Sequence, residues 1–140
     1  MDKIIFTIPY PATAADKKRW SQEYGLNAYY AGKHWAKRKR DAEFWHMLTR
    51  HAVQEAGIKH TRKPFKKPVV IKFYWNDRLD IDNHAAMGKM IVDGLKGNLL
   101  IDDDRKHLAS VQHFWHNENY IKVEIEEFSD EKQQKRTKAG

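Results

Sequence analysis

Short runs of apolar and β-branched residues predict four strands along the chain. Residues 3–8, KIIFTI, form the first run, which stops at a Pro-Tyr-Pro sequence. Residues 69–75, VVIKFYW, combine β-branched and aromatic side chains, as expected of a strand buried on at least one face. Residues 107–116 and 120–128 predict the two arms of a hairpin, because apolar and charged residues alternate in the second arm as in a half-buried antiparallel strand.

Two other segments carry apolar residues at the three- and four-residue spacing of an amphipathic helix. Residues 33–56 do so at Trp35, Ala42, Trp45, Leu48, Ala52 and Ala56. Residues 84–96 do so at Met87, Met90, Ile91 and Leu95, and Gly97 then favours a helix end. Residues 12–31 show little periodicity, so we expect a loop there, and residues 58–68 form a basic connector interrupted by prolines.

These elements predict one small α/β (α+β) domain over residues 1–128, in which a mixed sheet with a C-terminal hairpin packs on two main helices. The length of 140 residues suits a single domain, and 41% hydrophobic residues suffice for a core. Residues 129–140, SDEKQQKRTKAG, form a charged tail that we expect to be disordered.

Composition excludes several classes of function. The chain has no Cys, which excludes disulfides, thiolate catalysis and zinc–thiolate sites. No apolar run approaches the roughly 18 residues of a membrane span, and the first residues are too polar for a secretory leader. We therefore expect a soluble, cytoplasmic protein without a membrane partner.

Charge is divided unevenly along the chain. Residues 17–67 contain 14 Lys and Arg against 4 Asp and Glu, whereas residues 68–128 contain 7 against 11. The basic half indicates an anionic partner, for which nucleic acid is the commonest candidate. Because carboxylates repel phosphates unless a cation lies between them, the division favours a metal-dependent enzyme that acts on a polyanion. A basic surface that only aids solubility is the alternative.

Two acidic motifs follow apolar segments. Asp80 and Asp82 come shortly after the strand at 69–75, and Asp102, Asp103 and Asp104 follow Leu-Leu-Ile. If strand geometry continues through residues 79–82, Asp80 and Asp82 point to the same face. The two motifs could then converge at the ends of neighbouring strands, and carboxylate oxygens are the ligands that Mg²⁺ or Mn²⁺ prefers. For each motif, a solvated acidic turn is the alternative.

The same residues resemble the RusA-type Holliday junction resolvases over roughly residues 67–125. The resemblance rests on Asp80-Ile-Asp82-Asn83, Lys89, Asp93-Gly94-Leu95 and Ile101-Asp102-Asp103-Asp104. It implies a RusA-like fold and a homodimeric, Mg²⁺-dependent endonuclease, with Mn²⁺ as a possible substitute. Such an enzyme resolves four-way DNA junctions by paired symmetric nicks, in a bacterial or phage-infected cell.

The resemblance also implies roles for individual residues. The implied metal ligands are Asp80, Asp82, Asp103 and Asp104; all but Asp103 are also implied catalytic residues. Lys89 is the implied catalytic cation, although it follows Asp82 by seven residues rather than the four of the best-known member; an ion pair with Asp93 is its alternative. Asn83 would orient a carboxylate or water, or else cap the helix that starts there. Asp102 is taken as a bystander. His84 could add a ligand or contact phosphate, but a lone His at a helix start is more often a polar surface residue.

Basic residues at the start of the long predicted helix and in the connector are candidates for phosphate contacts. These DNA-binding candidates are Lys33, Lys37, Arg38, Arg40, Arg62, Lys63, Lys66 and Lys67. A solvated helix face is the alternative. The aromatic residues Phe114, Trp115 and Tyr120 are candidates for the dimer interface.

Two functions therefore stay open. The first is the metal-dependent resolvase, in which a metal-activated water attacks the phosphodiester. The second is a non-cleaving, basic protein that binds structured DNA with the same fold. Cleavage of a four-way junction in Mg²⁺, as opposed to binding alone, separates the two.

Overall fold

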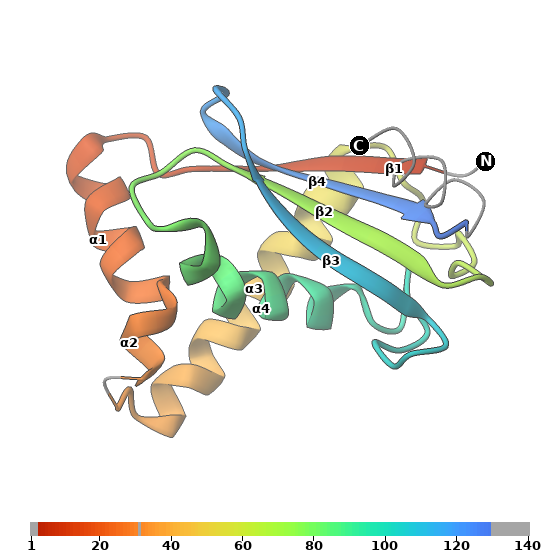
Figure 1. Ribbon diagram of the computed structural model, residues 1–140, viewed down its shortest axis with the longest axis horizontal. Helices are drawn as coiled ribbons and strands as arrows, with labels where there is room; N and C mark the ends of the chain where they lie inside the picture. Colours follow the sequence, from red (N-terminus) through yellow and green to blue (C-terminus); the bar gives the residue numbers. More distant parts are fainter. Residues whose placement is uncertain (1–2, 31, 130–140) are drawn as a thin grey trace, which may run out of the picture.

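The computed structural model describes residues 3–30 and 32–129. A mixed sheet of four strands carries the long helix α3 and the shorter helix α4 against one face, while α1 and α2 extend to the side (Figure 1). The elements are β1 (Lys3–Pro9), α1 (Ala14–Tyr24), α2 (Leu26–Tyr30), α3 (Trp35–Glu55), β2 (Val69–Trp75), the 3₁₀ turn η1 (Ile81–His84), α4 (Ala85–Leu95), β3 (Leu108–Trp115) and β4 (Tyr120–Glu127). The predicted mixed α and β class is confirmed.

The apolar core lies between the sheet and the helices. In β1 every second residue is buried, and Phe6 pairs with Val123 of β4, which in turn pairs with Phe73 of β2. This register places the three side chains on one face of the sheet, because alternate residues of a strand share a face. Trp45 of α3 and Ile91 of α4 are fully buried and belong to the same core.

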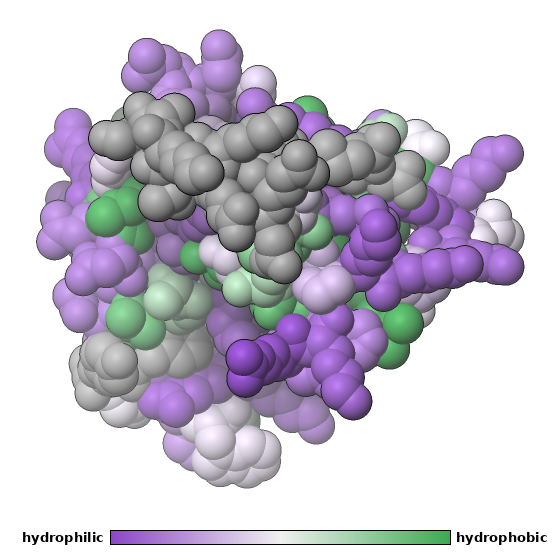
Figure 2. All heavy atoms as spheres, turned by 45° about the vertical axis from the view of Figure 1, so that its right-hand side comes forward, coloured by the Kyte–Doolittle hydropathy of each residue, from purple (hydrophilic) through white to green (hydrophobic). Residues whose placement is uncertain are grey.

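The opposite face of the sheet is charged. Lys3 pairs with Glu124 at 2.7 Å, and Lys72 pairs with Glu126 at 3.6 Å. The surface in Figure 2 is mostly hydrophilic, with small separate hydrophobic patches. Within the described residues, no helix has the length and apolar character needed to cross a membrane.

Segments with a strong local pattern form the elements predicted for them. The strands predicted at 3–8 and 69–75 are confirmed as β1 and β2. The helix predicted at 33–56 is α3, and the one predicted at 84–96 is α4, preceded by η1. Of the predicted tail, all residues except Ser129 lie outside the described residues.

The expected loop at residues 12–31 is wrong, because α1 and α2 occupy most of it. Thr13 caps α1, its side chain accepting a hydrogen bond from the Asp16 N–H at 3.1 Å. Trp20 is the one buried residue of α1, and its ring lies 6.0 Å from that of Trp45. A helix that buries a single large side chain has little amphipathic periodicity, which is why the pattern gave no signal.

The predicted hairpin is also wrong. Both strands exist, but β4 lies between β1 and β2 and is antiparallel to each, whereas β3 pairs in parallel with β2 at the edge of the sheet. β2 therefore separates β3 from β4. The crossover from β2 through α4 to β3 is a β-α-β unit, which joins parallel strands. Alternation along β4 indicates a strand but does not identify its partners.

Trp35 differs from its predicted place in the apolar stripe of the long helix. It is the first residue of α3 and its side chain is 71% exposed. The buried residues of α3 begin at Asp41 and continue with Trp45, Thr49, Ala52 and Val53. The first turn of α3 thus extends beyond the core that the rest of the helix contacts.

Candidate active site

The segment after β2 carries two exposed carboxylates. Asp80 has an extended backbone and Asp82 lies in η1, so the expected continuation of the strand through residues 79–82 is wrong. Asp80 occupies the N-cap of η1, where its backbone carbonyl accepts a hydrogen bond from the Asn83 N–H at 2.9 Å but its carboxylate caps nothing. Neither carboxylate forms a hydrogen bond or ion pair with the described residues, which leaves both available to a ligand.

A buried ion pair fixes both ends of this segment. The fully buried side chains of Asp77 and His84 meet at 2.8 Å, between the carboxylate Oδ1 and the ring Nε2. Asp77 also accepts hydrogen bonds from the Tyr10 hydroxyl at 2.8 Å and from the Leu79 N–H at 3.0 Å. Residues 77–84 therefore form a closed loop, which we call the Asp80 loop.

The hydrogen bonds of His84 define its charge. Its Nε2 faces the Asp77 carboxylate, and its Nδ1 faces the backbone carbonyl of Ile81 at 3.0 Å. Both partners only accept hydrogen bonds, so both ring nitrogens donate and the ring is an imidazolium. The ring stacks on Trp75 with centroids 4.3 Å apart.

The pKa values around this pair follow from burial and from the His84 charge. Burial alone would raise the pKa of Asp77, but hydrogen bonds from His84 and Tyr10 and the His84 charge hold that pKa below its ordinary value. Burial and the nearby His84 lower the pKa of His113, whose Nδ1 accepts a hydrogen bond from Trp75 Nε1 at 3.0 Å. Burial raises the pKa of Tyr10, which keeps its hydroxyl protonated as a donor.

Sequence reasoning missed this anchor. His84 is buried rather than a polar surface residue, and Asp77 belongs to no motif. Tyr10, the third member, lies 67 residues before Asp77, so no local pattern joins them. The available signal was only the position of Asp77 two residues beyond the mostly apolar strand β2.

Asn83 connects the Asp80 loop to α2. Its Oδ1 accepts a hydrogen bond from the Asn27 N–H at 3.1 Å, so it caps the first turn of α2 rather than the helix that follows it. The junction at Gly25 is tight, because a Cβ there would lie 3.1 Å from Leu79 and 3.4 Å from the Asn83 amide. The predicted capping of the helix that follows Asn83 is therefore wrong, and Asn83 instead holds the loop against α2.

Lys89 lies in a cluster of four charged side chains. Its Nζ is 2.7 Å from Asp103 and 3.1 Å from Asp93, and Lys96 pairs with the same two carboxylates at 3.1 Å each. The hydrogen bond to Asp103 raises the pKa of Lys89, and both lysines lower that of Asp103 far below its ordinary value. The Lys89 side chain is 59% exposed, so its charge also reaches solvent.

The predicted carboxylates are not brought together into one group. Asp80 and Asp82 lie before the first residue of α4. Asp103 pairs with Lys96, which follows the last residue of α4, and Asp104 pairs with His107, just before β3. Because β2 and β3 are parallel neighbours, residues after β2 and residues before β3 lie toward opposite ends of these two strands. Among the described residues, no three His, Asp or Glu side chains are placed to hold a metal ion together.

The predicted DNA-binding residues divide into two groups. Residues 37–40 are exposed at the start of α3, while Arg62, Lys63, Lys66 and Lys67 follow its end. With 21 residues, α3 is about 31 Å long at 1.5 Å per residue. The connector therefore does not extend the patch at the start of α3, and any shared ligand would have to span the helix.

Lys33 is not available as a phosphate contact. Its side chain is only 7% exposed and forms an ion pair with the equally buried Asp41. Its ammonium also donates a hydrogen bond to the Glu23 carbonyl at 2.8 Å. Lys37, by contrast, is half exposed and lies 3.5 Å from the Glu23 carboxylate. Lys33 thus fastens the start of α3 to the end of α1.

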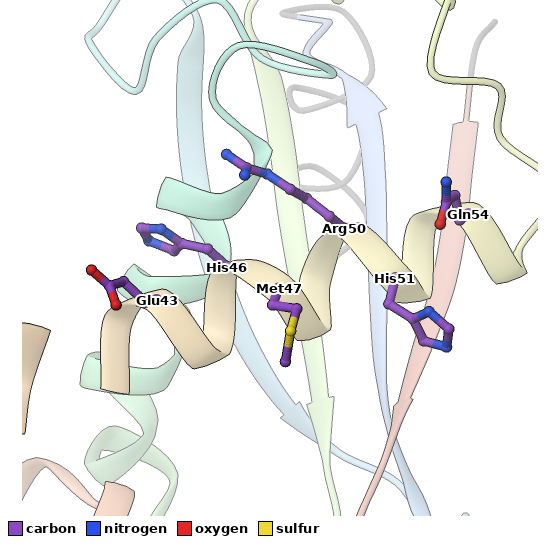
Figure 3. A pocket seen from close by; sticks show the side chains of 6 residues that line it. All are labelled: Glu43, His46, Met47, Arg50, His51 and Gln54. Carbon is purple, nitrogen blue, oxygen red and sulfur yellow. The ribbon is translucent and has the colours of Figure 1, made fainter. Parts of the chain in front are cut away.

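A hollow along α3 lies away from these groups. It has a volume of about 480 Å³ and is lined by Glu43, His46, Met47, Arg50, His51 and Gln54. Figure 3 shows that all six side chains project from α3. This hollow along a single helix contains none of the predicted site residues, so we do not assign it to the site.

Of the predicted interface residues, Phe114 and Trp115 are exposed on the edge strand β3. Tyr120 is partly buried against His116.

Comparison with models of known protein families gave no match to this chain, and comparison with curated proteins gave no match either.

Proposed function

We propose that this protein is a divalent-cation-dependent endonuclease that cuts four-way DNA junctions, as its resemblance to the RusA-type resolvases implies. The observation that carries the proposal is the Asp80 loop. Asp80 and Asp82 are exposed and have no hydrogen bond or ion pair with the residues that the structure describes, on a loop held by a buried His84–Asp77 pair. The two carboxylates are two residues apart in sequence, and a cation that both of them bind would offset the repulsion between their charges. A basic surface elsewhere on the chain would hold the DNA.

The donor chemistry of Asp80 and Asp82 fits Mg²⁺ or Mn²⁺, whose preferred ligands are carboxylate and water oxygens. Mg²⁺ commonly binds through one or two carboxylates plus water and substrate phosphates. Two protein ligands are therefore sufficient for this proposal. When bound, such a cation lowers the pKa of a coordinated water and offsets the charge of the phosphodiester.

In this proposal Lys89 supplies positive charge for the phosphate that is cut. Its raised pKa keeps the ammonium protonated, and its contacts with Asp93 and Asp103 fix the direction of the side chain. Asp103 thereby becomes an orienting residue for Lys89. Asp104 would be freed for ligation only by breaking its contact with His107.

The exposed basic residues at the start of α3 would bind the phosphate backbone without regard to sequence. We further propose that the protein is a homodimer, because two copies of the site are needed for two symmetric nicks. We also propose that it acts in the cytoplasm of a bacterial or phage-infected cell.

One observation favours the second candidate, a protein that binds branched DNA without cutting it. Asp103 is already neutralised by Lys89 and Lys96, and the four predicted carboxylates do not form one group. Binding of DNA through basic residues requires neither an unpaired Asp103 nor carboxylates that form one group.

Cleavage of a synthetic mobile four-way junction, in Mg²⁺ and in EDTA, tests the proposal. Wild type is compared with Asp82→Asn and with Glu43→Gln, which removes an exposed carboxylate of α3 that has no ion pair among the described residues. We expect metal-dependent nicks that Asp82→Asn abolishes, with binding retained, and that Glu43→Gln leaves unchanged. Tight binding by wild type without cleavage in Mg²⁺ or Mn²⁺ would instead support the second candidate.

A further inference from the structure

Trp35 has the largest exposed fraction among the large hydrophobic side chains of the described residues, at 71%. Its ring lies beside that of His34, with centroids 5.6 Å apart and planes inclined by 31°. His34 is itself fixed, because its Nδ1 accepts a hydrogen bond from the Ala36 N–H and caps α3. An indole in this position presents a flat apolar surface to solvent, where it has no role in the core.

Two cationic residues lie on the same face of α3 as this indole. Arg38 and Lys39 follow Trp35 by three and four residues, so they share its face of α3. Side chains of a helix lean toward its N-terminus, which brings both cations back toward the indole. Both residues are exposed. The surface therefore combines an aromatic plane with two positive charges, which we call the Trp35 platform.

The platform is anchored to the elements that carry the Asp80 loop. The buried Lys33–Asp41 pair fixes the start of α3, and the Lys33 ammonium also donates to the Glu23 carbonyl of α1. The next helix, α2, is tied to the Asp80 loop by the hydrogen bond from the Asn27 N–H to Asn83. One connected set of contacts thus positions both the exposed indole and the two exposed carboxylates.

We propose that Trp35 is a stacking surface for an unpaired base of DNA, while Arg38 and Lys39 bind the phosphates on either side of that base. Every base has a π-face, so stacking on an aromatic side chain tolerates any sequence. Cations beside the aromatic ring suit a polyanion and disfavour a basic protein surface, including a second copy of this chain. The inference rests on the proposed function for the source of the base, which is a strand opened at the branch point.

Salt dependence separates stacking from phosphate binding. The affinity for a fluorescently labelled single-stranded oligonucleotide is measured in EDTA over a range of salt concentrations. Trp35→Ala should weaken binding about 5- to 100-fold without changing the slope of log affinity against log salt. Lys39→Gln should make that negative slope shallower by about 0.7, the value for one phosphate contact on a single strand. Trp35→Phe should retain most of the affinity.

Met47→Ala is the matched control, since Met47 is also on α3 and is 61% exposed but lies about three turns from Trp35. It should bind like wild type. The inference is overturned if Trp35→Ala binds like wild type, if it changes the slope as Lys39→Gln does, or if Trp35→Phe is as weak as Trp35→Ala. Junction cleavage by wild type is scored separately. Cleavage without a Trp35 effect refutes only the platform, and a Trp35 effect without cleavage refutes only the nuclease.

Discussion

Replacing Asp77 with asparagine tests whether a charged pair holds the Asp80 loop. The substitution keeps the shape of a side chain that is fully buried and accepts hydrogen bonds from His84, Tyr10 and the Leu79 N–H. It removes the only formal negative charge that His84 contacts among the described residues. The imidazolium would then be buried without a counter-charge.

The expected cost follows from the contacts that are lost. Removing one partner of a buried ion pair costs about 3–5 kcal/mol. Tyr10→Phe removes only the neutral hydroxyl, which donates to Asp77 and accepts from the Asn76 N–H, and should cost about 1–2 kcal/mol. For a domain of 140 residues, a loss of about 3 kcal/mol lowers Tm by about 10 °C.

Urea unfolding followed by tryptophan fluorescence at neutral pH measures the free energy of unfolding of both variants and wild type. Glu43→Gln serves as the exposed carboxylate control and should be within about 0.5 kcal/mol of wild type. If Asp77→Asn is no more destabilising than Tyr10→Phe, the pair does not carry opposite charges and the reasoning about His84 is refuted.

Three further predictions concern other charged groups. Folding lowers the pKa of Asp77 from 3.8, so the contribution of its charge to stability is complete above pH 3.8 and is lost as the pH falls through the folded pKa. When the free energy of unfolding is measured as the pH is lowered, Asp77→Asn should therefore lose less stability than wild type. Lys33→Met should cost about 3–5 kcal/mol in urea unfolding, because it removes one partner of a buried ion pair, and the double variant Lys33→Met/Asp41→Leu should recover most of that loss. A fully exposed pair would show under about 1 kcal/mol. Lys89→Met should slow junction cleavage at saturating DNA about 100-fold while binding changes less than twofold; equal losses in both would assign Lys89 to binding alone.

Elements with a complete local signal were predictable from the sequence. The apolar run of β2 and the three- and four-residue spacing of α4 lie within their own residues, and both elements form where predicted. The pairing of the strands was not predictable, because β3 takes β2 as its partner through a crossover rather than its neighbour in sequence, β4. The helix α1 escaped prediction because Trp20 is its one buried residue.

The candidate site was predictable only in part. Spacing correctly predicts that Lys89 and Asp93 pair across one helical turn, and the exposure of Asp80 and Asp82 suits ligand binding. The pairing of Asp103 with Lys89, and the burial of Lys33 against Asp41, depend on contacts between elements. Lys33 and Asp41 are eight residues apart, and neither their residue types nor this spacing indicates that Lys33 is buried while Lys37 is exposed.

Linearisation of a plasmid that carries an extruded cruciform tests the central claim most directly. Paired nicks across the branch point of one junction convert such a plasmid to the linear form, whereas single nicks leave an open circle. The account predicts linear product from wild type in Mg²⁺, none in EDTA, and none from Asp82→Asn even though that variant still binds the cruciform. Linear product from Asp82→Asn at the wild-type rate, or binding by wild type with no cleavage in Mg²⁺ or Mn²⁺, would contradict it.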